Sequence, residues 1–142
     1  MASDIDVSML WEAADARSAL AARFGFTDAD HVASWFERAL AEAWSGRLDR
    51  CDRLVISDRN LLAWLTVDGR DVVAKCCVDS TRFARLAAVD ALVSWLGEHR
   101  MPVAAPIAAA DGRLRVEHGR FSIGLYPFIR GDLLDAAAIS TR

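Results

Sequence analysis

The sequence lacks the residue patterns of a metal site or a disulfide framework. It holds three cysteines, and Cys76 and Cys77 are adjacent in one expected strand, where their side chains would point to opposite faces. The three histidines stand far apart in the sequence, so the spacing of zinc ligands is absent. We therefore expect the cysteines to pack as small core residues.

Long apolar runs and an excess of basic residues are absent as well. No apolar run approaches the roughly 18 residues of a membrane span, and residues 1–17 have neither a basic leader nor a continuous apolar segment. The formal net charge is -3 with the two signs interspersed, which argues against nucleic acid as a partner. These absences predict a soluble, cytoplasmic protein that contacts neither a membrane nor nucleic acid.

The composition is that of an ordinary globular domain. Hydrophobic residues make up 54% of the chain and charged residues 26%, and the 142 residues fit one domain that buries roughly two-thirds of its unfolded surface. No repeat and no internal domain boundary is evident. The best candidate for a linker is the stretch 127–131, where proline and glycine bracket a short apolar pair.

Two amphipathic helices are predicted in residues 1–49, which we interpret as an N-terminal helical extension. The first follows apolar residues spaced by three and four, and Gly25 is placed to end it. The second runs over 27–46 with acidic residues in its first turn. The apolar positions of the first helix are Met9, Ala13, Ala16, Leu20 and Phe24. Such helices serve as an extra packing layer or, alternatively, bind a partner.

The hydrophobic period changes in residues 50–131. Strands are predicted at 53–57, 61–67 and 70–78, with a hairpin turn at Asp68-Gly69, which gives an antiparallel meander. Ser80 is placed to cap the next helix, and two or three short strands follow it up to residue 128. The fold class is therefore α+β, with an antiparallel sheet of about five strands and one packed helix. Residues 132–142 begin like a further helix.

Three stretches in this order carry a family resemblance. They are "SDRNLLAWLTVDGRDVVAKCC", "ALVSWLGEHRMPVAAPI" and "GLYPFIRGDLL", and together they cover about residues 50 to 135. Their order resembles the N-terminal lobe of the protein-kinase-like fold, and most closely that of the aminoglycoside phosphotransferase family. The resemblance rests on order and spacing, because each motif alone is unspecific.

The resemblance implies that Lys75 is the nucleotide lysine of a kinase-like lobe. On a strand, Val73, Lys75 and Cys77 share one face, so a purine would lie against Val73 while the Lys75 ammonium reaches the phosphates of ATP. The phosphate charge would compensate the desolvation of the ammonium. The alternative is a lysine at a strand edge whose stem packs while its head stays in water.

The resemblance also assigns a phosphate turn and a hinge. Ser57 and Asn60 flank a turn without glycine, whose backbone amides would face phosphate; alternatively their side chains simply cap the turn. Tyr126 takes the gatekeeper position. The Pro127 carbonyl and the Ile129 N–H would bind adenine, unless this segment is an ordinary strand end.

The helix glutamate that pairs with the lysine in this family is missing. Val89 stands at the corresponding position, and Asp90 beside it is a possible partner of Lys75 if the helix is rotated. Asp90 lies about 100° round the helix from Val89 and is one carbon shorter than glutamate. A plain solvated position for Asp90 is the alternative.

The motifs that transfer phosphate are missing after the hinge. In the family, H-G-D…N and D-x-D type motifs supply the base and the magnesium ligands, and neither follows residue 131. We expect either the N-terminal lobe of a longer phosphotransferase, which binds Mg only with its C-terminal lobe, or a free-standing lobe that dimerises. The first is favoured, because an apolar helix from Asp132 would otherwise lack a partner. A non-catalytic protein-interaction module and an unrelated α+β domain with an incidental lysine are the other hypotheses.

Overall fold

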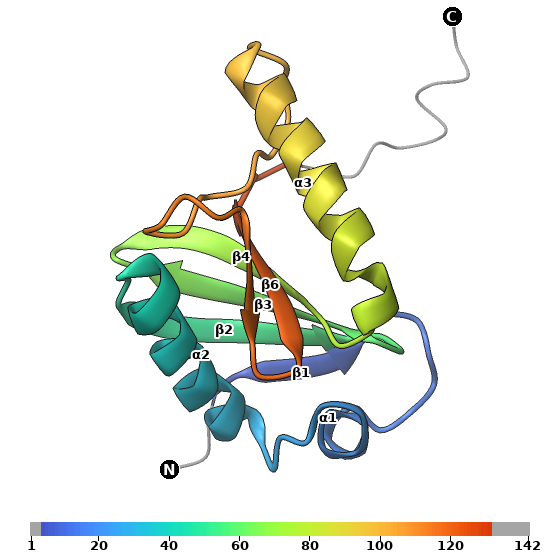
Figure 1. The fold of residues 1–142 in the computed structure, drawn as a ribbon. Coiled ribbons are helices and arrows are strands. Elements are labelled where there is room, and N and C mark those ends of the chain that lie inside the picture. The colour runs from blue at the N-terminus through green and yellow to red at the C-terminus, as the bar shows by residue number, and fades with distance from the viewer. Residues whose placement is uncertain (1–3, 132–142) are drawn as a thin grey trace, which may run out of the picture.

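The computed structural model describes residues 4–131, which form a six-stranded sheet with three α-helices (Figure 1). In chain order the elements are β1 (Asp6–Met9), α1 (Ala16–Phe24), α2 (Ala29–Trp44), β2 (Leu48–Ile56), β3 (Asn60–Val67), β4 (Arg70–Cys77), a 3₁₀ turn (Ser80–Arg82), α3 (Phe83–Glu98), β5 (Arg115–His118) and β6 (Phe121–Pro127). The predicted α+β class is correct.

The predicted meander is present and forms the centre of the sheet. Strands β2, β3 and β4 pair antiparallel in sequence order, and β6 then pairs antiparallel with β4. Asp68 and Gly69 turn the β3–β4 hairpin with positive φ angles of 50° and 75°, the backbone of a type I′ turn. The strand order is β1-β2-β3-β4-β6-β5, so β4 is a central strand.

The N-terminal segment differs from the sequence prediction. Residues Asp6–Met9 form a strand that pairs parallel with β2, so the sheet is mixed and has six strands rather than about five antiparallel ones. The first helix begins at Ala16 instead of Met9, because the Asp15 carboxylate accepts a hydrogen bond from the Ser18 N–H at 3.0 Å and caps it there. The predicted stop at Gly25 is correct, with a φ of 76°.

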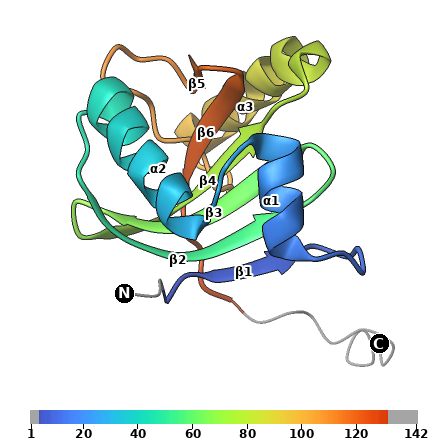
Figure 2. The same ribbon diagram turned by 90° about the horizontal axis from the view of Figure 1, so that it is seen from below.

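One face of the sheet, here called the core face, is covered by α1 and α2 (Figure 2). Alternation along each strand turns every second residue toward these helices. Buried core residues from the helices include Leu20, Phe24, Val32, Phe36 and Leu40, and those from the sheet include Leu54, Leu61, Leu65, Ala74, Ile123 and Leu125. Residues 1–49 therefore supply one wall of the main hydrophobic core as well as a strand.

The opposite face, here called the cavity face, is flanked by α3 at the side of β4, β6 and β5 (Figure 1). The predicted cap at Ser80 is wrong. Ser80 begins a 3₁₀ turn that Asp79 caps by accepting from the Thr81 N–H at 3.2 Å, and α3 starts at Phe83 after Arg82, which makes no capping hydrogen bond through its side chain. The only buried residue of α3 is Asp90. Much of its apolar surface is exposed.

The helix expected from Asp132 lies outside the described residues. Within residues 4–131 no helix combines the length and the apolar character that crossing a bilayer requires.

Candidate functional site

Lys75 projects from the middle of the cavity face. In the register of the sheet it stands opposite Leu62 on β3 and Gly124 on β6, and neighbouring strands lie about 4.8 Å apart. Lys75 is exposed, while Ala74 and Cys76 on either side of it are buried on the core face. The predicted alternation along "DVVAKCC" is therefore correct, and Lys75 is not at an edge of the sheet.

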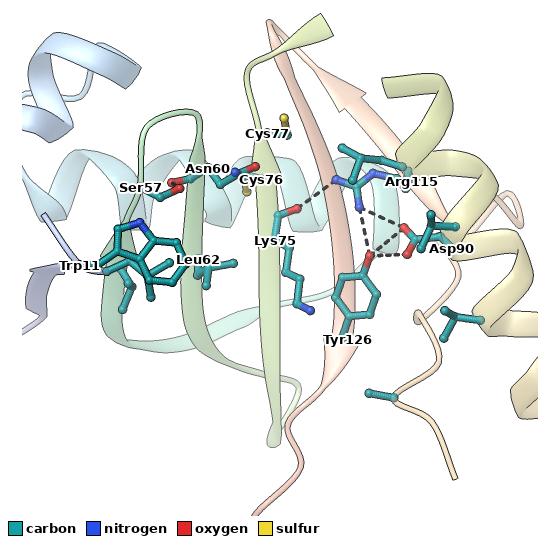
Figure 3. Close-up of a pocket in the computed structure, with 16 residues that line it drawn as sticks. Trp11, Ser57, Asn60, Leu62, Lys75, Cys76, Cys77, Asp90, Arg115 and Tyr126 are labelled. Atoms are coloured by element: carbon teal, nitrogen blue, oxygen red, sulfur yellow. Dashed lines mark hydrogen bonds and ion pairs between the residues drawn. The ribbon is translucent and has the colours of Figure 1, made fainter. Parts of the chain in front are cut away.

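A cavity of about 450 Å³ lies over this face, between the sheet and α3 (Figure 3). Apolar side chains from α3 form one wall, and residues 10 and 11, which follow β1, form the opposite wall. The lining residues are Leu10, Trp11, Val55, Ser57, Asn60, Leu62, Lys75, Cys76, Cys77, Leu86, Val89, Asp90, Val93, Ala104, Arg115 and Tyr126. The size suits a small organic ligand.

Asp90 is held by a buried network at the α3 side of the cavity. The Tyr126 hydroxyl donates to its two carboxylate oxygens at 2.6 and 2.7 Å, and Nη1 of Arg115 donates to Oδ2 at 3.0 Å. The side chains of Arg115 and Asp90 are only 7% and 6% exposed. Because a buried charge is costly unless it is paired, this ion pair with its hydrogen bonds accounts for the burial of Asp90.

Arg115 is fixed by more than its ion pair. Its Nε donates to Oγ of Ser122 at 2.9 Å, and its Nη2 donates to the carbonyls of Ser122 and Lys75 at 3.1 and 3.3 Å. The same Nη1 that reaches Asp90 also donates to the Tyr126 hydroxyl at 3.0 Å. The guanidinium thus joins β5, β6, β4 and α3 in one network.

Gly124 makes room for this network. A Cβ built on it would lie 2.5 Å from the Tyr126 hydroxyl and 2.6 Å from Nη1 of Arg115, closer than carbon atoms approach such groups. Tyr126 and Gly124 share a face of β6, so the ring lies over the glycine. Burial is the main cause that raises the pKa of Tyr126, and the hydrogen bond to Asp90 raises it further. The hydroxyl therefore keeps its proton and acts as a donor.

Lys75 meets the other side of Tyr126. Its Nζ lies 4.8 Å from the centre of the Tyr126 ring, a cation–π contact that leaves the ammonium facing the cavity. Among the described residues no carboxylate forms an ion pair with it. Lys75 is also the only lysine in the sequence, where every other side-chain cation apart from histidine is an arginine. The cavity therefore contains one compact, unpaired positive charge beside a neutral Asp90–Arg115 pair.

The β2–β3 turn closes one end of the cavity. The Ser57 N–H donates to the Asn60 carbonyl at 3.0 Å, and the Ser57 hydroxyl contacts the same carbonyl at 3.4 Å. Arg23 donates to the Ser57 carbonyl at 3.0 Å and forms an ion pair of 2.6 Å with Glu12. This clamp ties the turn to α1 and to the segment that carries Trp11. Trp11 itself is 80% exposed.

The predicted hinge continues from β6. Pro127 pairs with Val72, and the Phe128 N–H donates to the Asp71 carbonyl at 3.2 Å. Ile129 is 62% exposed.

The cavity brings together five of the eight residues that the sequence singled out. Lys75, Ser57, Asn60, Tyr126 and Asp90 line it. Val73, Pro127 and Ile129 are not among its lining residues; Val73 is half-buried and stands opposite Tyr126 in the register. Their roles in nucleotide binding stay predictions.

The pairing of Asp90 with Lys75 is not what the structure shows. Asp90 is buried, which also excludes the solvated alternative, and its partners are Arg115 and Tyr126. The reason is that α3 places Asp90 at the hydroxyl end of Tyr126, where Arg115 from the edge strand β5 also lies, whereas Lys75 contacts the ring.

Sequence reasoning missed Arg115 and Trp11. Leu114 and Val116 flank Arg115, and this alternation predicts that Arg115 points away from Val116 and the core. The position of Trp11 had no local signal, because it depends on the pairing of β1 with β2. Within residues 4–131 no cluster of three or more His, Cys, Asp or Glu side chains is arranged to hold a metal ion.

Comparison with known proteins supports the fold. No protein-family model matches the chain, and no curated protein is significantly similar to it. Among solved structures, the spectinomycin phosphotransferase APH(9)-Ia, in complex with ADP and spectinomycin, is similar over 70% of this chain, with a TM-score of 0.57 and 12% sequence identity. This chain spans 30% of the length of that one. The likeness concerns the fold alone and supports a kinase-like fold for this chain.

Proposed function

We propose that this chain is the ATP-binding N-terminal lobe of a phosphotransferase of the aminoglycoside phosphotransferase family that acts on small molecules. The observation that carries the proposal is Lys75, a lone lysine on the third strand of the meander that faces the cavity and has no carboxylate partner among residues 4–131. Its place in a kinase-like fold is that of the lysine that binds the α- and β-phosphates.

In the proposed complex the phosphates lie between Lys75 and the turn at Ser57 and Asn60. A phosphate supplies the negative charge that Lys75 lacks, through charge-assisted hydrogen bonds. The purine lies toward Val73, and the Pro127 carbonyl and the Ile129 N–H bind its edge. This mode uses both the cavity and the exposed segment that follows β6.

Transfer of phosphate requires groups that this sequence does not supply after its hinge. In kinase-like enzymes an aspartate positions the acceptor hydroxyl, and asparagine and aspartate side chains hold magnesium. We propose that a C-terminal lobe provides these groups and the acceptor site. The chain alone is then expected to bind nucleotide without transferring phosphate.

Calorimetric titration of the chain with ADP tests this proposal. Lys75→Ala is expected to weaken binding about tenfold or more, because it removes a charge-assisted contact to phosphate of about 1.5–3 kcal/mol. Arg38→Ala is the matched control, since Arg38 is an exposed cation on α2, across the sheet from the cavity. Absence of ADP binding, or equal binding by wild type and Lys75→Ala, would overturn the proposal.

A second candidate is a protein-interaction or dimerisation module, and the surface of α3 favours it. Val89, Leu92 and Trp95 are 47%, 57% and 52% exposed on this helix, and such apolar patches mark contact surfaces. Sedimentation velocity distinguishes the two. If the chain is such a module, we expect it to self-associate tightly and Leu92→Ser to abolish the association. ADP should then have no effect that depends on Lys75.

A further inference from the structure

We propose that Tyr126 is the positioning residue of Lys75: its ring holds the ammonium in place through a cation–π contact, while its hydroxyl is fixed to α3 through Asp90. The inference deepens the proposed function and rests on it for the identity of the ligand that Lys75 meets. Its basis is a single side chain that contacts the strand lysine with its ring and the helix carboxylate with its hydroxyl.

The first step is the register of β4 and β6, which brings this ring close to this lysine. Lys75 stands directly opposite Gly124, and Tyr126 lies on the same face, two positions further along β6. Diagonal neighbours of this kind in antiparallel strands are within reach of long and aromatic side chains. Whether they meet depends on the residue that stands between them, which is Gly124.

Gly124 lets the ring lean toward Lys75. A Cβ built on Gly124 would lie 2.9 Å from Cε2 and 2.5 Å from the hydroxyl oxygen of Tyr126, so the ring occupies the space that a side chain opposite Lys75 would fill. Nζ of Lys75 lies 4.8 Å from the ring centre, inside the range of a cation–π contact. Figure 3 shows the end of the lysine side chain beside the ring.

The second step is what fixes the ring. The Tyr126 hydroxyl donates to both carboxylate oxygens of Asp90, at 2.6 and 2.7 Å, and accepts from Nη1 of Arg115 at 3.0 Å. Tyr126 is only 8% exposed. Because three hydrogen-bond contacts hold the hydroxyl end and the ring lies over Gly124, the ring keeps one orientation toward Lys75.

The third step is the division of roles between Asp90 and Tyr126. In kinase-like enzymes a helix glutamate holds the strand lysine directly. In the described part of this chain, Asp90 forms its ion pair with Arg115, and the contact recorded for the Lys75 ammonium is the Tyr126 ring. The helix carboxylate therefore acts on Lys75 through this ring, and α3 stays coupled to the lysine by way of β6.

The consequence is a lysine that is oriented before its ligand arrives. A lysine side chain has many rotamers, and ordering them opposes binding. Lys75 is exposed, so a contact that holds its ammonium over one ring lowers this cost. In the proposed complex the phosphates of the nucleotide then meet an ammonium in a defined position.

The first measurement needs neither a ligand nor a variant. Lys75 is the only lysine and Tyr126 the only tyrosine in the sequence, so NMR of protein with isotope-labelled lysine and tyrosine, purified without a tag that contains either, observes these two residues alone. We expect a nuclear Overhauser effect between the Lys75 ε-CH2 and the Tyr126 ring protons. We also expect an upfield ring-current shift of the ε-CH2 signal that unfolding in urea removes. An ε-CH2 signal without either effect overturns the inference.

The second measurement separates the ring from the hydroxyl. Tyr126→Phe keeps the ring, whereas Tyr126→Leu removes the ring and the hydroxyl, and each variant is first checked by circular dichroism. The upfield shift is expected to persist in Tyr126→Phe and to disappear in Tyr126→Leu. Trp95→Leu is the matched control and should keep the shift, because Trp95 is an exposed aromatic residue of α3 that stacks on His99 and does not line the cavity. An unchanged shift in folded Tyr126→Leu overturns the inference.

Calorimetric titration with ADP tests the consequence for binding. Tyr126→Leu is expected to bind ADP about two- to fivefold more weakly than Tyr126→Phe, the fold-change that corresponds to one cation–π contact at an exposed site. Both variants lack the hydroxyl, so a merely structural role of Tyr126 through Asp90 predicts equal affinities. Equal affinities of the two folded variants overturn the positioning role.

The inference and the proposed function fail in different ways. If ADP binding depends on Lys75 but the nuclear Overhauser effect is absent, the proposed function stands and the inference fails. If the NMR signals are as expected while ADP binding does not depend on Lys75, the proposed function fails and the contact that holds Lys75 stands. Where Tyr126→Leu does not fold, the spectrum of the wild type decides.

Discussion

The Tyr126 hydroxyl donates to both carboxylate oxygens of Asp90, at 2.6 and 2.7 Å, and so joins strand β6 to helix α3. Asp90 is the one buried residue of that helix. The other side chains of α3 that face the sheet are only half-buried. The hydrogen bonds of Asp90 are therefore the main contacts that fix the position of this helix beside Lys75. Substitutions around Tyr126 test this arrangement most directly.

Replacing Gly124 by alanine is expected to destabilise the protein. The new methyl group would meet the Tyr126 hydroxyl at 2.5 Å and Nη1 of Arg115 at 2.6 Å, and overpacking of this kind costs about 1–3 kcal/mol. Urea unfolding measures the change. Gly131→Ala is the control, because no atom of residues 4–131 is found within 4 Å of its Cβ position, and equal midpoints for the two variants would contradict the predicted clash.

Alkaline pH is expected to lower the stability of the fold. Burial raises the pKa of Cys51 from 9.0 to about 12. Between these two pH values the folded state keeps the thiol proton while the unfolded state releases it. The contribution of Cys51 to the free energy of unfolding is therefore fully present below about pH 9 and is lost as the pH rises toward 12. Tyr126, whose pKa is also raised, adds to the loss above about pH 10.

The contribution of Cys51 is measured by urea unfolding between pH 8 and pH 11, compared with Cys51→Ala. Each such group steepens the fall by at most about 1.4 kcal/mol per pH unit. A shallower fall in Cys51→Ala is therefore expected. Identical slopes would show that the partly buried Cys51 thiol does not have a raised pKa in the folded state.

Trp11 is expected to report on ligands that fill the cavity. Its indole lines the cavity and is 80% exposed, so a bound nucleotide should shield it from acrylamide and shift its emission to the blue. Trp11→Phe should abolish the change. Trp95→Phe should retain it, because Trp95 is exposed on α3 but does not line the cavity; a signal lost only in Trp95→Phe would place the ligand elsewhere.

Two leucines are expected to differ sharply in their effect on stability. Leu61 is fully buried on the core face, whereas Leu92 is 57% exposed on α3. Leu61→Ala is expected to cost about 2–5 kcal/mol through lost burial and a cavity. Leu92→Ala is expected to stay within about 0.5 kcal/mol of wild type. Chemical denaturation measures both, and a large loss in Leu92→Ala would mean that this helix face is covered in solution.

The predictions that held rest on signals within a few residues. The alternation of "DVVAKCC" put Lys75 on the face opposite Cys76, and Asp68-Gly69 supplied the backbone of a hairpin turn. Capping marked the helix stop at Gly25. The hydrophobic period and the residue types that favour turns are local properties of the chain. They can therefore be recognised in the sequence without knowledge of the fold.

The predictions that failed depended on partners far along the chain. The stretch Asp6–Met9 pairs with Arg53–Ile56, and a helical spacing from Met9 was overridden by these strand hydrogen bonds. Asp90 lies 25 residues from Arg115 in sequence, and helical position alone does not say which cation meets a carboxylate. Tertiary pairing decided both cases.

By itself, the sequence determined the meander, the helix after it and the face of the strand on which Lys75 stands, because these follow from local periodicity. Only the tertiary structure decided which groups surround that lysine. Asp90 pairs with Arg115, since the edge strand carries Arg115 beneath α3, and Trp11 reaches the cavity, since β1 joins the sheet beside β2. A buried charge must be paired, and its partner is the oppositely charged group that the packing of the elements brings nearest. The local sequence does not specify that neighbour.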